Sequence, residues 1–358
     1  MTASPLRNGD STDGAAGDTG APGTGADDSI DHHGGPAAEN QRGRVGRAST
    51  ADEEDHVQLG MIGLGRMGGN MAERLCAAGH DVVGYDPFNE ASDVASLEEL
   101  VAALSPPRTA WVMVPAGKPT DDTIQALSLL LEPGDLVVDG GNSRFDDSLV
   151  HGGLLTERGI GFVDAGVSGG VWGRTEGYAL MVGGDEDHVG QVWPALVSLA
   201  PDGAESSGRG LAHVGPVGAG HFTKMVHNGI EYAVMQAFGE GYELMSRHHL
   251  GIDVEAALRC WQEGSVVRSW LLDLLVRGLE QHPGLEDLAD VAPDSGEGRW
   301  TVQTAVDTGV PVPAIAASLW ARFESQTEQS LTMKAVAALR EQFGGHAVVV
   351  HHPQEDPS

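Results

Sequence analysis

A glycine-rich turn between an apolar run and an amphipathic segment is the feature that most constrains this chain. The apolar run covers residues 57–62, and the segment 66–78 carries apolar residues at helical spacing. Between them the pattern G-x-G-x-x-G allows a tight turn, a close backbone approach to a pyrophosphate and tight packing of helix on strand. The helix N-terminus then presents unpaired N–H groups to the phosphates. We expect a dinucleotide to contact Gly63, Leu64, Gly65, Arg66, Met67 and Gly68.

An acidic residue, Asp86, follows the second predicted strand, 81–85, about twenty residues beyond the glycines. A carboxylate at this place accepts hydrogen bonds from the adenosine ribose and repels a 2′-phosphate. The alternative is an ordinary acidic turn before Pro87. We therefore expect NAD as the cofactor, with NADP less favoured.

Two different patterns divide the chain after residue 56. From 57 to 217 short apolar runs alternate with helical segments, which is typical of a parallel sheet with crossover helices. The predicted strands are 57–62, 81–85, 109–114, 136–138, 162–164 and 179–182. From 218 to 344 the pattern is helical throughout, with helices predicted at 218–249, 253–263, 267–281, 301–307, 312–326 and 332–343. The fold class is an α/β Rossmann-type dinucleotide-binding domain followed by an all-α domain for substrate and oligomer contacts.

The two ends of the chain differ from both predicted domains. Residues 1–56 are rich in Gly, Ala, Ser, Asp and Thr and contain no aromatic residue. Such a segment buries too little apolar surface to offset the entropy lost on ordering, so we expect a disordered acidic tail. We expect residues 345–358 to form a frayed C-terminus.

The charge balance restricts the class of partner. Lysine and arginine number 21 against 52 aspartates and glutamates, and the net charge of −31 argues against nucleic acid or an anionic membrane. No apolar run is long enough for a secretory signal or a membrane span. Cys76 and Cys260 fall in predicted helices without disulfide-like or metal-like spacing. We expect a cytoplasmic protein with a small-molecule substrate and no metal.

The segment 224–232 carries the side chains best suited to chemistry. At 3.6 residues per turn, Lys224, His227, Asn228 and Glu231 fall on one stripe of the predicted helix. Together they supply a proton acceptor, a proton donor and two orienting groups, which acid/base chemistry on a polyol acid requires. The alternative is a solvated helix face with one i,i+7 charge pair, the usual explanation for an isolated segment of this kind.

Three loops follow predicted strands, where a sheet of this type binds its ligand. They cover 114–117, 139–143 and 166–173, and each alone is an ordinary glycine-containing loop. Taken with the segment 224–232, in this order and spacing, they closely resemble decarboxylating 6-phosphogluconate dehydrogenase. The resemblance runs from about residue 57 to 343, and the run Lys-x-x-His-Asn-Gly-Ile-Glu-Tyr is its most specific part.

The resemblance implies a role for each matching residue. The lysine matching Lys224 is the general base in that family, and the glutamate matching Glu231 is the general acid. The positions matching substrate-binding residues are Asn142, Ser168, Gly169, Gly170, His227 and Asn228, with Tyr232 and Arg322 at phosphate-binding positions. Val114 and Asn142 are expected at the cofactor. The implied reaction, in the pentose phosphate pathway and gluconate utilisation, converts 6-phosphogluconate and NAD to ribulose 5-phosphate, carbon dioxide and NADH.

The chain departs from the longer members of this family in two ways. Ser295 and Glu297 stand where those members carry a lysine and a threonine that help to bind phosphate, and Arg299 is the candidate replacement cation. We also expect neither the second helical repeat nor the C-terminal tail of the longer members, so the chain resembles a shorter bacterial branch. We expect a homo-oligomer formed through the helical domain, since a short chain leaves apolar helix faces to cover. The preference for phosphorylated or free gluconate stays open.

Two other functions remain open. A β-hydroxyacid dehydrogenase of the hydroxyisobutyrate type shares the cofactor motif, a Ser-Gly-Gly loop and the lysine, but oxidises without decarboxylating. The runs 227–232 and 139–143 favour a sugar acid and a proton donor instead. A catalytically inactive binding module is the other alternative, and such a protein should have lost Lys224, Glu231 or the glycines, all of which are present.

Overall fold

The computed structural model describes residues 56–204 and 208–344, together with Ala347 and Val349. Within these ranges seven strands form one sheet, in the order β2-β1-β3-β4-β5-β6-β7. The strands are β1 Gln58–Ile62, β2 Asp81–Tyr85, β3 Thr109–Val112, β4 Leu136–Asp139, β5 Gly161–Ser168, β6 Ala179–Gly184 and β7 Leu211–Gly215. The predicted tail, apart from His56, and most of the predicted frayed end lie outside the described residues.

The described sheet is parallel, as predicted, except between β5 and β6. β6 runs antiparallel to β5, with Ser168 opposite Ala179. The connection between these two residues contains only a short 3-10 turn, Gly170–Trp172, and a one-turn helix, α5, Gly173–Glu176. A parallel crossover needs about a dozen residues or more, so the chain returns beside β5 in the opposite direction.

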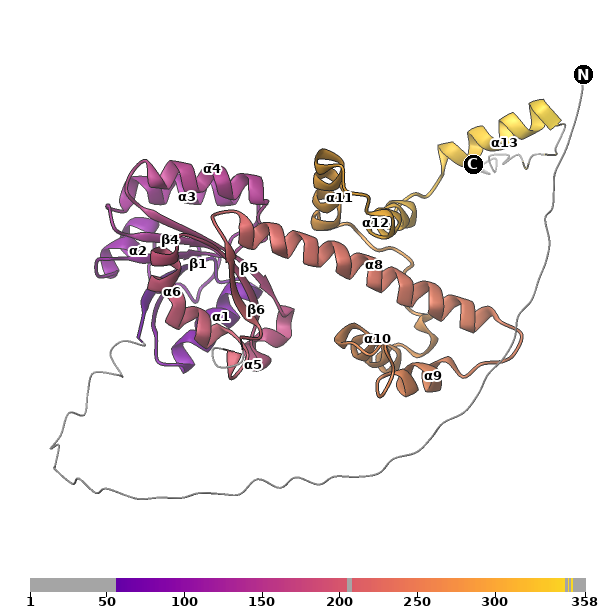
Figure 1. Ribbon diagram of the computed structural model, residues 1–358, viewed down its shortest axis with the longest axis horizontal. Coiled ribbons are helices and arrows are strands. Elements are labelled where there is room, and N and C mark those ends of the chain that lie inside the picture. The colour runs from indigo at the N-terminus through magenta and orange to yellow at the C-terminus, as the bar shows by residue number, and fades with distance from the viewer. Residues whose placement is uncertain (1–55, 205–207, 345–346, 348, 350–358) are drawn as a thin grey trace, which may run out of the picture. The chain divides into compact units, whose positions relative to one another are not determined.

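Helices cover both faces of the sheet, and each face has its own hydrophobic core (Figure 1). The helices are α1 Arg66–Ala77, α2 Leu97–Ala103, α3 Lys118–Leu130, α4 Phe145–Thr156 and α6 Glu186–Leu199. Residues of α1 and α6 pack on one face, and residues of α2, α3 and α4 pack on the other. Because side chains alternate along a strand, Met61 and Val138 join the first core while Ile62 and Val137 join the second.

The rest of the described chain is helical, as predicted. The helices are α8 Ala219–Arg247, α9 Val254–Trp261, α10 Trp270–Gln281, α11 Glu297–Thr308, α12 Pro313–Ser325 and α13 Leu331–Gly344, with a 3-10 turn at Pro283–Leu285. α8 contacts β5 and β6 of the sheet and also α11 and α12 (Figure 1). The predicted fold class, a Rossmann-type domain followed by an all-α domain, is confirmed. None of the helices described here has the length and apolar character needed to cross a membrane.

The N-terminus of α8 is fixed to the sheet by Asp164 of β5. This carboxylate is fully buried and accepts hydrogen bonds from the N–H groups of Gly218, at 2.6 Å, and His221, at 2.8 Å. Two of the unpaired donors at the start of the helix are thereby satisfied. One turn further along, a Cβ on Gly166 would lie 2.5 Å from the Cβ of Lys224, so only glycine lets α8 lie this close to β5.

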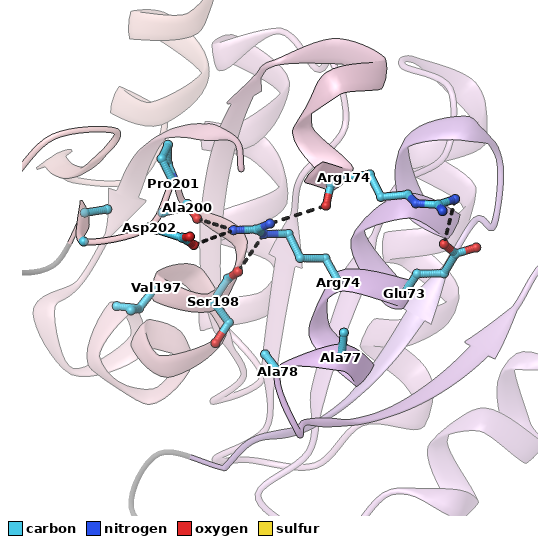
Figure 2. A pocket seen from close by; sticks show the side chains of 12 residues that line it. Glu73, Arg74, Ala77, Ala78, Arg174, Val197, Ser198, Ala200, Pro201 and Asp202 are labelled. Carbon is cyan, nitrogen blue, oxygen red and sulfur yellow. Dashed lines mark hydrogen bonds and ion pairs between the residues drawn. The ribbon is translucent and has the colours of Figure 1, made fainter. Parts of the chain in front are cut away.

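A cavity of about 730 Å³ lies between α1 and the C-terminal end of α6 (Figure 2). The Arg74 guanidinium donates hydrogen bonds to the carbonyl oxygens of Ser198, at 2.9 Å, and Ala200, at 2.8 Å. It also donates to the carbonyl oxygen of Arg174 and lies 3.7 Å from the Asp202 carboxylate. The arginine therefore fastens α1 to α6, and its role is structural.

Candidate active site

The glycine-rich turn joins β1 to α1 and lines a cleft of about 860 Å³. Gly63 has a φ of +96°, and a Cβ on Gly68 would lie 1.9 Å from the carbonyl oxygen of Gly63. Gly65 is the N-cap of α1, and a Cβ on it would meet no described atom within 4 Å. The space before the helix N–H groups is thus open to an anion, and the turn fits the pyrophosphate of a dinucleotide.

This cofactor cleft is lined by all but one of the predicted cofactor-binding residues: Gly63, Gly65, Arg66, Met67, Gly68, Asp86, Val114 and Asn142. Leu64 contributes its backbone instead, because its N–H donates to Oδ2 of Asp86 at 2.9 Å. The other carboxylate oxygen of Asp86 accepts the N–H of Phe88 at 2.9 Å. These two bonds hold the carboxylate just beyond the end of β2.

A second cleft, of about 960 Å³, lies beside the Ser-Gly-Gly loop that follows β5. The predicted residues that line this substrate cleft are Ser168, Gly169, Gly170, Lys224, His227, Asn228 and Glu231. Lys224 also lines the cofactor cleft, together with Asn142. The structure therefore brings the stripe on α8, the loop after β5 and the nucleotide-binding turn to one place, with Lys224 common to both clefts.

The Lys224 amine lies among polar groups of its own helix. Its Nζ donates to Oδ1 of Asn228 at 2.5 Å, and Nδ1 of His227 lies 3.0 Å from the same oxygen. The His227 Nδ1 is also 3.8 Å from Oε2 of Glu231. Burial lowers the pKa of Lys224 below the ordinary value for an amine, while the carboxylates of Glu231 and Glu297 oppose that shift. The lowered pKa increases the neutral fraction of the amine, the form able to take up a proton.

Tyr232 and Arg322, the predicted phosphate-binding residues, line neither cleft. The Tyr232 ring is buried beneath the Arg322 guanidinium, whose central carbon lies 3.5 Å from the ring centroid. The Tyr232 hydroxyl donates to the Asp294 carboxylate at 3.1 Å and lies 2.9 Å from Oγ of Ser295. Arg299, the candidate replacement cation, also donates to Asp294, at 2.9 Å. The Asp294 carboxylate thus accepts hydrogen bonds from Tyr232 and Arg299, two residues that could otherwise bind a phosphate.

Several residues that line the clefts were given no ligand-binding role from the sequence, among them two tryptophans and Glu297. Trp172 and Trp270 line the substrate cleft, and the Arg277 guanidinium stacks on Trp172 at 4.6 Å from its ring centroid. Glu297 lines the cofactor cleft although it is distant in sequence from the glycine-rich turn. The sequence placed Glu297 only at a position where longer family members bind phosphate, and it gave no sign that this residue lines the nucleotide cleft. Among the described residues no cluster of His, Cys, Asp and Glu could hold a metal ion.

Comparison with known proteins covers both halves of the chain. Residues 58–208 match the family model described as the NAD binding domain of 6-phosphogluconate dehydrogenase, and residues 220–353 match the model of its C-terminal domain. A putative 6-phosphogluconate dehydrogenase of Bacillus subtilis, YqeC, is 41% identical over 300 residues, covering 81% of this chain and 99% of the relative. An NAD(+)-dependent, decarboxylating 6-phosphogluconate dehydrogenase of Haloferax volcanii is 40% identical over 304 residues, covering 82% and 98%.

Solved structures agree with these sequence matches. The 6-phosphogluconate dehydrogenase of Plasmodium falciparum, studied with NADP+ and with 6-phosphogluconate, is 27% identical. It superposes with a TM-score of 0.68 over 84% of this chain and 67% of that one. A 3-hydroxyisobutyrate dehydrogenase of Mycobacterium tuberculosis, 23% identical with a TM-score of 0.56 over 74% of this chain and 90% of that one, shares the fold. Matches that extend over both the sheet and the helices show that this chain belongs to the 6-phosphogluconate dehydrogenase family and is an oxidoreductase of that decarboxylating type.

Proposed function

We propose that this protein converts 6-phosphogluconate to ribulose 5-phosphate and carbon dioxide with reduction of NAD. The observation that carries the proposal is the position of Lys224, a half-buried amine that lines both the nucleotide cleft and the cleft beside the Ser-Gly-Gly loop. A base at this junction meets the substrate carbon and the cofactor together. Glu231 lies two turns along the same helix in the substrate cleft, where it can supply a proton.

The residues divide the chemistry between them. Neutral Lys224 takes the proton of the carbon-3 hydroxyl while that carbon is oxidised, and the nicotinamide, when bound, accepts the hydride. The resulting ammonium of Lys224 then polarises the new ketone, where negative charge develops as carbon dioxide leaves. Glu231 returns a proton to the carbon that lost the carboxylate. We assign substrate positioning to Ser168, Gly169, Gly170, Asn142, His227 and Asn228.

Tyr232 and Arg322 are proposed to act at the phosphate end of the site. Their support is the family resemblance, because both lie outside the lining of the two clefts. Asp294 engages the Tyr232 hydroxyl, so binding of a phosphate there requires that hydroxyl to exchange its acceptor. A phosphate would also find the guanidinium of Arg322 stacked on the same ring.

The preference for NAD over NADP is proposed to depend on Asp86. Replacement of Asp86 by alanine should lower the ratio of kcat/KM for NAD to that for NADP by about 10-fold or more, since a charge-assisted hydrogen bond to the ribose is lost. Steady-state kinetics with both cofactors measure this ratio. Glu90→Ala, an exposed acidic residue of the same loop, is the matched control. An unchanged ratio in the Asp86 variant would remove this residue from cofactor selection.

We assign the cofactor to residues 57–217, which also contribute Asn142 and the Ser-Gly-Gly loop to substrate binding, and the other substrate contacts and the oligomer contacts to residues 218–344. Large apolar side chains exposed in the helical region support association with a second copy; they include Leu244, Leu250, Val306, Trp320 and Leu339. The exposed thiols of Cys76 and Cys260 suit a reducing, cytoplasmic compartment. The reaction would serve the pentose phosphate pathway and gluconate utilisation.

A comparison of substrates and cofactors tests the proposed function. The kcat/KM values for 6-phosphogluconate, free gluconate and 3-hydroxyisobutyrate are measured with NAD and with NADP by absorbance of the reduced cofactor. We expect the highest value for 6-phosphogluconate with NAD. A highest value for 3-hydroxyisobutyrate would favour the β-hydroxyacid dehydrogenase alternative, and a highest value for free gluconate would remove the phosphate from the proposal.

A further inference from the structure

A chain of hydrogen bonds connects the two halves of the protein beside Lys224. Asn142, in the loop after β4, donates from Nδ2 to Oε1 of Glu297 at 2.5 Å. The other carboxylate oxygen, Oε2, accepts the hydroxyl of Ser295 at 2.7 Å. The Ser295 Oγ lies 2.9 Å from the hydroxyl of Tyr232 on α8. Glu297 is the member of this chain that bonds directly to the cofactor-binding half.

Close packing of α11 on α8 fixes the position of Glu297. A Cβ on Gly298 would lie 2.5 Å from the Tyr232 ring, and a Cβ on Gly229 would lie 2.9 Å from Thr301. The Thr301 hydroxyl lies 2.9 Å from the carbonyl oxygen of Met225 on α8. Since neither helix can shift without losing these contacts, Glu297, only 5% exposed, is held in one place at the start of α11.

Burying a carboxylate costs free energy unless hydrogen bonds or a paired charge compensate for the lost contacts with water. A buried charge is stable when it is paired or bonded, and Glu297 has a donor for each of its oxygens. One of those donors, Asn142, lines the cofactor cleft together with Glu297 and Lys224. With one N–H of Nδ2 donated to Glu297, the Asn142 side chain can still offer its second N–H and its carbonyl oxygen to a ligand.

We propose that Glu297 is a positioning residue that holds Asn142 of the cofactor-binding half beside Lys224 of the helical half. The kinetic test of this inference rests on the proposed function. The Glu297 carboxylate is bonded to Asn142 and to Ser295, and these hydrogen bonds do not depend on the identity of the substrate. It orients the Asn142 amide toward the cleft and places a negative charge near the Lys224 amine.

The charge of Glu297 predicts a shift in the pH profile. The titratable groups that line the two clefts with Lys224 are Arg66, Tyr85, Asp86, His227, Glu231 and Glu297. The buried Asp164 of β5, the strand packed under α8, is bonded to Gly218 and His221 and stays the same in every variant. The carboxylates of Glu231 and Glu297 act to raise the pKa of Lys224 against the lowering effect of burial. Loss of one carboxylate should therefore lower that pKa further.

Three variants separate the hydrogen bond from the charge. Glu297→Gln keeps the size of the side chain and an acceptor for Asn142 but removes the charge. Glu297→Ala removes both. Asp307→Asn removes a negative charge from an exposed position on the same helix and is the control. The measurements are the dissociation constant for NAD by equilibrium titration and the pH dependence of kcat/KM for 6-phosphogluconate.

We expect Glu297→Gln to move the acid limb of the pH profile to lower pH, because neutral Lys224 then persists to lower pH. Glu297→Ala should raise the dissociation constant for NAD by about 10-fold and lower kcat/KM by about 100-fold, because Asn142 is then misplaced. Glu297→Gln, in contrast, should keep most of the wild-type affinity for NAD. If both variants matched Asp307→Asn in NAD affinity and pH profile, Glu297 would have no positioning role, even if their thermal stability fell. Failure of the proposed function shows separately, as absent turnover of 6-phosphogluconate by the wild-type protein that still binds NAD.

Discussion

Lys224→Ala should lower kcat with 6-phosphogluconate and NAD by about two to four orders of magnitude, the usual contribution of a positioned general base. The lysine is proposed to act twice, as the acceptor of the hydroxyl proton and as the cation beside the developing ketone charge, so no neighbour can replace it. Alanine keeps the Cβ that lies against Gly166 and therefore preserves the packing of α8 on β5. Steady-state turnover at saturating substrate and cofactor gives the size of the loss.

The control for this variant is Lys334→Ala, which removes an exposed lysine of α13. It should leave both turnover and NAD affinity unchanged. NAD affinity should also stay close to that of the wild type in Lys224→Ala, since the nucleotide-binding turn is untouched. Turnover of Lys224→Ala within a few-fold of the wild type would contradict the assignment of the base.

Glu231→Gln should lower the formation of ribulose 5-phosphate by about two to four orders of magnitude, because glutamine cannot donate the proton that completes the reaction. A sharper readout is the exchange of the carbon-1 hydrogen of ribulose 5-phosphate with deuterium from the solvent. This exchange needs the proton donor but no net oxidation. It should be slowed in Glu231→Gln to the same extent as the full reaction.

Glu240→Gln provides the matched control, since Glu240 is exposed on the same helix and, among the described residues, its side chain is bonded only to Gln236. Its rates of turnover and deuterium exchange should equal those of the wild type. Wild-type exchange in Glu231→Gln would show that another group protonates carbon 1. His227, whose Nδ1 lies 3.8 Å from Glu231, would then be the next residue to test.

The fold could be predicted where the sequence pattern is local. The helix predicted at 218–249 is observed at Ala219–Arg247, because its periodicity and the glycines near its ends mark it. The strand predicted at 81–85 has those bounds, because Gly79 ends the preceding helix and Asp86-Pro87 follows the strand. β5 was predicted only over 162–164, since its second half contains glycine and serine, but pairing with β6 extends it to Ser168. β7 was not predicted, because only its first residue, Leu211, is buried. Partner strands, rather than local composition, decide such cases.

The candidate site likewise has some features that sequence spacing predicted and others that only the tertiary structure reveals. A period of 3.6 residues sufficed to predict that Lys224 and Glu231 share a face, and they line one cleft. The bond between Asn142 and Glu297 joins residues 155 positions apart, and only the packing of α11 on α8 brings them together. Tyr232 was assigned to phosphate by resemblance, while the structure buries its ring and bonds its hydroxyl to Asp294. Contacts between distant segments depend on tertiary packing, which no spacing in the sequence records.

The most direct test of the central claim is the stoichiometry of the wild-type reaction. The claim is that one amine and one carboxyl group on α8 carry oxidation through to loss of carbon dioxide. Carbon dioxide and NADH are measured together from a limiting amount of 6-phosphogluconate. We predict one carbon dioxide released for each NADH formed, with ribulose 5-phosphate as the product. NADH formation without carbon dioxide would contradict the claim.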